Sequence, residues 1–235
     1  MQIPQKIKPI PNEILNQDYD LIILAYQVWY LTPSIPINSF LKSEEAKQLF
    51  NGKKVLTLSE AEIHGQGSEK IHTILSDYKA EIVGNITLTD KNINHVSVLT
   101  ILHWMFTGKT RYLGFFQNLV PQQDDIDTSV KFGDIILPHI QKSDYQNMQE
   151  ELAKAGAVNI NHFLIFTDVR ANKLFGLWAN WIYGNPKRPF LLRLFSIYLW
   201  IGIWVLMPIA FLLYALTYPL FFLKRKKELN YYQSI

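Results

Sequence analysis

Two short loops carry the side chains best suited to bind a flat, conjugated ligand. Residues 27–33 (QVWYLTP) follow an apolar run and hold Trp29 and Tyr30, whose rings can stack on another ring system. Residues 59–65 (SEAEIHG) follow a second apolar run and offer hydroxyl and backbone groups. Ordinary packing against a neighbouring helix explains the two aromatic residues equally well, so both interpretations stay open.

Other residues with chemical potential give weaker signals. Glu60, Glu62 and His64 alternate, so an extended loop would project them to one side. Catalytic metal sites need better-defined spacing, and we therefore interpret these three as solvated loop residues and expect no metal. His103 lies in an apolar, aromatic insert over residues 94–116 and is a weak candidate for a catalytic proton carrier.

Composition excludes several classes of protein. The 235-residue chain is 49% hydrophobic, which is too apolar for a disordered protein. It has no cysteine, so a thiolate nucleophile, a disulfide and an iron–sulfur cluster are excluded. From Asn185 onward there are seven basic residues and one acid, and the rest of the chain is mildly acidic. No basic stripe runs through the body, which argues against a nucleic-acid partner.

The two loops must be positioned by the elements around them. Apolar runs predict strands over residues 20–26, 53–58 and 81–88. The first of these (DLIILAY) is continuous, as is typical of a strand buried on both faces. Helical spacing predicts helices over 39–50 and 68–78 and a further helix from Asp124. This order indicates an α/β fold with a doubly wound parallel sheet, whose ligands bind beyond the carboxyl ends of the strands.

The carboxyl-terminal part predicts a membrane segment. Leu194–Leu223 is a run of 30 uncharged residues, whereas roughly 20 suffice for a transmembrane helix. Both flanks are basic, and basic flanks prefer the cytoplasmic side. Pro208 lies at the middle, so we slightly favour a shallow re-entrant hairpin over one long tilted span. No signal peptide is visible, so we expect the body on the cytoplasmic side of the inner membrane.

Several motifs resemble a known family. The stretch 18–41 (DYDLIILAYQVWYLTPSIPINSFL) resembles the third strand, flavin loop and following helix of flavodoxin-like proteins, and 52–58 (GKKVLTL) resembles their fourth strand. More narrowly, 26–29 (YQVW), 39–47 (SFLKSEEAK), 104–109 (WMFTGK) and the basic, apolar tail are similar to the flavodoxin-like proteins named dialkylresorcinol condensing enzymes.

That resemblance implies an FMN-binding oxidoreductase at the membrane. Its expected reaction is the oxidation of a cyclohexanedione intermediate to an aromatic resorcinol in dialkylresorcinol and flexirubin-type lipid biosynthesis. The preceding condensation would belong to a ketosynthase-like partner, and a dialkyl substrate would partition into membrane lipid. The resemblance places the cofactor contacts at Gln27, Val28, Trp29, Tyr30, Ser59, Ala61 and Gly65.

The sequence departs from that family at two places. The first strand, the phosphate-binding loop and the first helix are missing before residue 18, so we expect a flavodoxin-like domain truncated at its amino terminus. Glu60 and Glu62 place negative charge beside any flavin, which disfavours its anionic reduced form. A degenerate, non-catalytic docking module that has lost FMN is therefore the alternative.

Three regions summarise the expected organisation. Residues 1–142 form the partial flavodoxin-like domain. Residues 143–186 form a connector, with an amphipathic helix over Asn161–Tyr183 whose aromatic side can reach the membrane interface. Residues 187–235 form the membrane anchor with its basic flanks, as a transmembrane or re-entrant helical segment.

Overall fold

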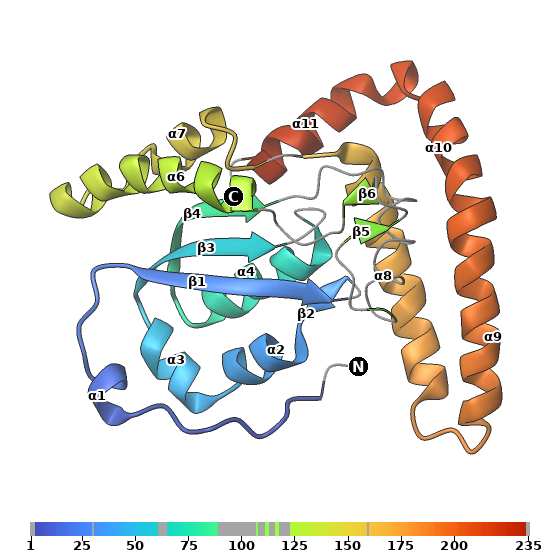
Figure 1. The fold of residues 1–235 in the computed structure, drawn as a ribbon, viewed down its shortest axis with the longest axis horizontal. Coiled ribbons are helices and arrows are strands. Elements are labelled where there is room, and N and C mark those ends of the chain that lie inside the picture. The colour runs from blue at the N-terminus through green and yellow to red at the C-terminus, as the bar shows by residue number, and fades with distance from the viewer. Residues whose placement is uncertain are drawn as a thin grey trace.

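The chain forms a mixed α/β domain followed by a long helical region (Figure 1). The computed structural model describes residues 3–29, 31–60, 65–88, 107, 111–112, 116–117, 123–158 and 160–233. Four strands form the main sheet in the order β2-β1-β3-β4. They are β1 (Ile22–Trp29), β2 (Thr32–Pro33), β3 (Lys54–Glu60) and β4 (Glu81–Leu88).

The three long strands are parallel, as the sequence predicts. Gln27 of β1 lies opposite Glu60 of β3, and Glu60 lies opposite Leu88 of β4. The three strands thus end at one edge of the sheet, which we call the carboxyl edge. β2 is antiparallel to β1 and pairs only with Val28 and Trp29.

One face of the sheet is covered by α2 (Ile35–Leu41), α3 (Glu44–Phe50) and α4 (Gln66–Asp77). The predicted single helix over 39–50 is wrong, because the chain turns at Ser43. Ser43 adopts an extended conformation, and its side-chain oxygen accepts a hydrogen bond from the Ala46 amide at 3.1 Å. A serine in this role starts a new helix rather than continuing the old one.

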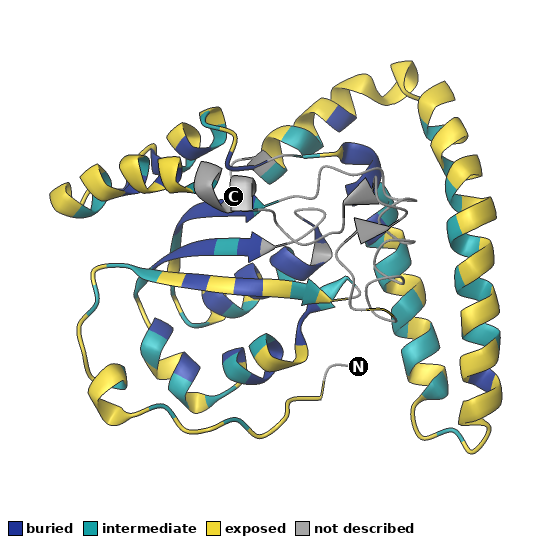
Figure 2. Ribbon diagram, viewed as in Figure 1, coloured by how far each residue is buried: buried dark blue, intermediate teal, exposed yellow. Residues whose placement is uncertain are grey.

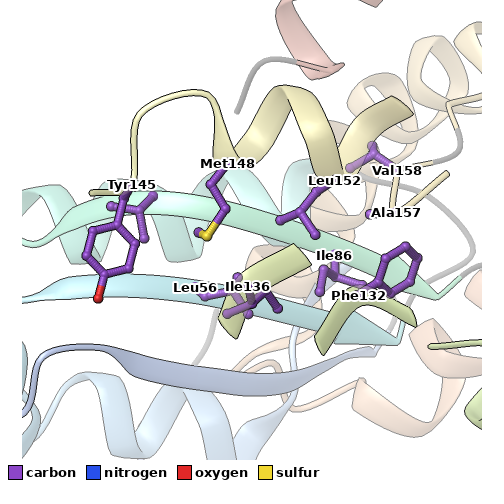
Figure 3. Packing of buried hydrophobic residues seen from close by; sticks show 10 residues of the cluster. Leu56, Ile86, Phe132, Ile136, Tyr145, Met148, Leu152, Ala157 and Val158 are labelled. Atoms are coloured by element: carbon purple, nitrogen blue, oxygen red, sulfur yellow. The ribbon is translucent and has the colours of Figure 1, made fainter. Parts of the chain in front are cut away.

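The opposite face is covered by α6 (Gln123–Lys142) and α7 (Met148–Lys154), which pack on β3 and β4 (Figure 3). Met148 and Leu152 of α7 are fully buried over Leu56 and Ile86 of the strands. Helices therefore lie on both faces of the sheet. The insert predicted over residues 94–116 falls almost wholly outside the described residues, apart from Thr107, β5 (Arg111–Tyr112) and the first residue of β6 (Phe116–Gln117).

β1 differs from its prediction. The continuous apolar run indicates burial on both faces, but the side chains of β1 alternate between buried and exposed (Figure 2). Leu24 and Tyr26 face the core, whereas Ile23 is 55% exposed. Among the described residues, α6 and α7 pack on β3 and β4 and do not cover the second face of β1. Hydrophobicity alone could not reveal this, because it depends on which strands the helices cover.

The carboxyl-terminal half contains α8 (His162–Ile182) and one long apolar helix from Arg188 to Leu216. α8 confirms the helix predicted over Asn161–Tyr183. The long helix consists of α9 (Arg188–Ile201), a π-helical turn η1 (Gly202–Leu206) and α10 (Met207–Leu216). By length and composition it is able to cross a bilayer.

The hairpin that we favour at Pro208 is wrong. A proline inside a helix lacks an amide donor and clashes with the carbonyl four residues earlier. Here the wider π turn ends at Leu206, two residues before Pro208, and includes Trp204, the residue four before the proline. The helix therefore continues through Pro208 without reversing. The chain turns only after Leu216, through a 3₁₀ turn at Pro219–Phe221 into α11 (Phe222–Gln233).

α8 and the long apolar helix are packed against each other through aromatic rings. α8 runs antiparallel to the long apolar helix and lies between it and the sheet domain (Figure 1). Near one end Phe163 packs on Phe211 with ring centroids 5.2 Å apart, and near the other Phe175 packs on Phe195 at 5.5 Å. The short helix α1 (Asn12–Leu15) contacts α3 on the far side of the domain.

Candidate functional site at the carboxyl edge

The two loops singled out by the sequence begin side by side at the carboxyl edge. Val28, at the end of β1, contacts the start of α4 at Gly67. A Cβ atom on Gly67 would lie 2.6 Å from Cγ1 of Val28, so only glycine allows this approach. The expected ligand residues Gln27, Trp29 and Ser59 also lie at the ends of β1 and β3. The juxtaposition follows from the parallel pairing of these two strands.

A buried polar group lies directly behind the loops. The Tyr26 hydroxyl donates a hydrogen bond to Oγ of Ser68 at 2.9 Å, and both residues are buried. Burial raises the pKa of the Tyr26 hydroxyl, so the group stays neutral. Ser59 is fully buried and donates to Oγ1 of Thr87 at 3.2 Å. Ser59 therefore points into the sheet core and is not available to a ligand.

The most unusual charged groups at this edge lie on the first turn of α4. Glu69 is half-buried, and within the described part of the chain its Oε1 has no hydrogen-bond partner. Burial raises the pKa of the Glu69 carboxyl. Burial lowers the pKa of Lys70, and the nearby Asp168 carboxylate counteracts that change. Groups with shifted pKa values gathered at the ligand edge of a parallel sheet are typical of a functional site.

Replacing Glu69 with glutamine is expected to stabilise the protein at neutral pH. The pKa of Glu69 is raised in the folded state, so the folded protein holds a proton that the unfolded chain releases above about pH 4.5. The contribution of Glu69 to the free energy of unfolding therefore falls as pH rises through that range. Glu69→Gln cannot ionise and so removes this loss of stability. Thermal unfolding at pH 4 and pH 7.5 tests this. An equal effect of the substitution at both pH values would contradict it.

Helix α8 closes the carboxyl edge from outside. Asp168 is buried, and its carboxylate fills the space beside Gly65 that a side chain would occupy. Nδ2 of Asn172 donates to the Leu31 carbonyl oxygen at 2.6 Å. Nζ of Lys70 donates to Oδ1 of Asn172 at 3.2 Å. A carboxylate at the start of α4 is favourable because helix amino termini carry partial positive charge.

These contacts decide how well FMN fits the described residues. On the β1 side, Trp29 is 46% exposed and offers a face for a flat ring. On the α4 side, the Asp168 carboxylate occupies the position beside Gly65 where the resemblance expects a flavin contact. In this arrangement the residues do not fit a flavin on both sides. Tyr30, Ala61, Glu62, His64 and His103 lie outside the described residues, and so does the side chain of Glu60.

A second polar group joins α8, α10 and α11. His162, at the start of α8, places Nδ1 3.0 Å from the Tyr214 hydroxyl and Nε2 2.6 Å from Oε2 of Glu228. This group holds α11 against α8 and α10, so that α11 returns toward the carboxyl edge (Figure 1). Across the ranges that the structure describes, no three histidine, aspartate or glutamate side chains are placed to hold a metal ion.

The sequence predicted a site at the carboxyl edge of the sheet but did not identify the charged residues that are most distinctive there. Glu69 and Lys70 sit on a helix that the sequence identified only by its apolar positions, and Asp168 is about a hundred residues further along the chain. No local pattern marks them, because their burial comes from packing between α4 and α8. No protein-family model, curated protein or solved structure matches this chain.

Proposed function

We propose that this chain is the membrane-associated, flavodoxin-like part of an FMN-dependent oxidoreductase that acts on a lipid-like intermediate. The proposed reaction is the oxidative aromatisation of a cyclohexanedione to a resorcinol, with the condensation step left to a ketosynthase-like partner. The observation that carries this proposal is that β1 and β3 end side by side, next to a cluster of buried and half-buried polar groups, at one edge of a parallel sheet.

The long apolar helix supports a lipid-like substrate. It packs along α8, and α8 in turn contacts the carboxyl edge through Asp168 and Asn172. A substrate with two alkyl chains would concentrate in a bilayer beside that helix, and α8 separates the helix from the carboxyl edge. The proposed location is the cytoplasmic face of the inner membrane.

A non-catalytic docking module is the second candidate. The observation that favours it is the Asp168 carboxylate beside Gly65, which occupies one side of the expected flavin site. The uncovered face of β1, with Ile23 and Trp29 exposed, would then serve as the surface that binds a partner enzyme.

Flavin binding by an Asp168 variant distinguishes the two candidates. If the site binds FMN, Asp168→Asn is expected to raise its affinity about tenfold, because a negative charge beside the flavin is removed; tenfold corresponds to about 1.4 kcal/mol. The full chain in detergent is titrated with FMN and followed by absorbance between about 350 and 500 nm. Asp77→Asn, at the exposed opposite end of α4, is the matched control for loss of charge.

The outcomes separate the candidates clearly. Tighter binding by Asp168→Asn, with Asp77→Asn unchanged, supports a flavin site that Asp168 partly closes. Equal, near-stoichiometric FMN binding by the wild type and both variants supports the oxidoreductase and shows that Asp168 does not obstruct the flavin. No binding by any of them contradicts flavin use by this chain and favours the docking module.

A further inference from the structure

The position of the sheet domain along the apolar helix limits how that helix can meet a bilayer. Phe163 contacts Phe211 and Phe175 contacts Phe195, so the middle of α8 lies level with the middle of the helix, near Gly202. The middle of α8 carries Asp168 and Asn172, which hold the sheet domain. The domain is therefore attached at the mid-height of the apolar helix, not beyond one of its ends (Figure 1).

A helix that crossed the bilayer would carry this attachment to the bilayer centre. The helix spans 29 residues, which is about 43 Å, and the hydrocarbon core is about 30 Å thick. Lys70, Asn172 and the carbonyl of Leu31 would then lie at the depth where charged groups are most costly. Arg170 and Lys173, which are exposed on α8 at the same level, would be carried there too.

The positions of two tryptophans in the helix also argue against a crossing helix. Trp200 and Trp204 stack with centroids 6.2 Å apart on either side of Gly202, and they are 51% and 39% exposed. Tryptophan prefers the membrane–water interface over the hydrocarbon centre. In a crossing helix these two rings would lie at the bilayer centre. In a helix parallel to the surface they would lie at interfacial depth.

Charge at the two ends of the helix is complementary to a lipid surface. Lys187, Arg188 and Arg193 lie at one end and are exposed. Lys224, Lys226 and Lys227 of α11 lie beyond the other end and are exposed as well. Basic residues prefer the cytoplasmic, anionic side of a membrane, so basic residues at both ends of an apolar segment favour an arrangement with both ends on that side.

We infer that the helix Arg188–Leu216 lies in the plane of the membrane and enters an anionic bilayer from one side, with α8 between it and the sheet domain. The helix is exposed along most of its length (Figure 2), and its exposed residues include many large hydrophobic side chains. Its other side packs on the aromatic rings of α8, so the helix need not be amphipathic by itself. This inference rests on the membrane association in the proposed function. It replaces the long span and the hairpin that the sequence suggests.

Depth measurement along the helix tests this arrangement directly. Because the chain has no cysteine, single substitutions allow specific labelling. Ile197→Cys, Val205→Cys and Leu212→Cys are exposed positions along the helix, and Lys47→Cys on the sheet domain is the water-exposed reference. Each full-length variant carries an environment-sensitive fluorophore in vesicles of phosphatidylcholine with about a third phosphatidylglycerol. Quenching by lipids with a spin label near the headgroup or near the chain end reports depth.

Labelling from outside the vesicles shows on which side of the bilayer each end of the helix lies. Tyr183→Cys and Lys226→Cys mark the two ends, and sealed vesicles with the added protein are treated with a membrane-impermeant maleimide. Equal, shallow depth at the three helix positions with both ends labelled supports an in-plane helix. If the label at Val205→Cys lies deepest, the in-plane arrangement is overturned. Protection of one end from the maleimide would then show that the helix crosses the bilayer, and labelling of both ends would show that the segment is re-entrant. Failure of all variants to float with the vesicles would instead contradict membrane association itself.

Discussion

The protein is expected to lose about 3 kcal/mol of unfolding free energy between pH 7 and pH 4 because of His72. This side chain lies on α4 and is only 7% exposed. Burial lowers its pKa from 6.5 to about 4. The folded state keeps the ring neutral while the unfolded chain takes up a proton, and each pKa unit corresponds to about 1.36 kcal/mol. The stability is therefore present above pH 6.5 and is lost as pH falls toward 4.

Denaturant unfolding of the full chain in detergent, followed by tryptophan fluorescence, measures this loss. His72→Asn is expected to unfold at lower denaturant at pH 7 and to lose much less stability on acidification. Thr73→Asn, on the exposed side of the same helix, is the control and keeps the full pH dependence. The same decline in wild type and His72→Asn would show that other groups cause the acid sensitivity.

Replacing Arg225 with alanine is expected to release α11 from the rest of the protein. Arg225 is buried, and its guanidinium donates to the Tyr214 carbonyl at 3.1 Å and to Oγ1 of Thr217 at 3.0 Å. Its Cζ also lies 3.9 Å from the ring centroid of Tyr214. Charged hydrogen bonds and a cation–π contact of this kind together contribute about 3 kcal/mol. That corresponds to roughly a hundredfold loss of hydrogen-exchange protection in α11.

Hydrogen exchange resolved by segment tests the effect of Arg225. Lys226→Ala, which removes an exposed neighbouring charge, is the control and should leave α11 protected. Arg225→Lys keeps the charge but not the two-pronged contact, so intermediate protection is expected. If Arg225→Ala exchanged no faster than the control, the contact with Glu228 and His162 would be sufficient to hold α11.

The elements that are bounded by local sequence signals were predicted most accurately. β4 has the bounds predicted from its apolar run, and β3 and α4 lie within two residues of theirs. These elements are bounded by local signals, such as the turn at Asn51-Gly52 before β3, that act over a few residues. The helix boundary at Ser43 was missed because the same residue is compatible with a helix interior and with a cap. Only the path of the chain decides between them.

The sequence by itself determined the alternation of strands and helices, the long apolar helix, and the edge at which β1 and β3 end. These features follow from periodicity and from the shared direction of parallel strands. Only the tertiary structure decided that Asp168 fills the space beside Gly65, that His72 is buried and Glu69 half-buried, and that the sheet domain is attached midway along the apolar helix. Burial and electrostatics arise where distant segments pack, and hydropathy does not encode which segments meet.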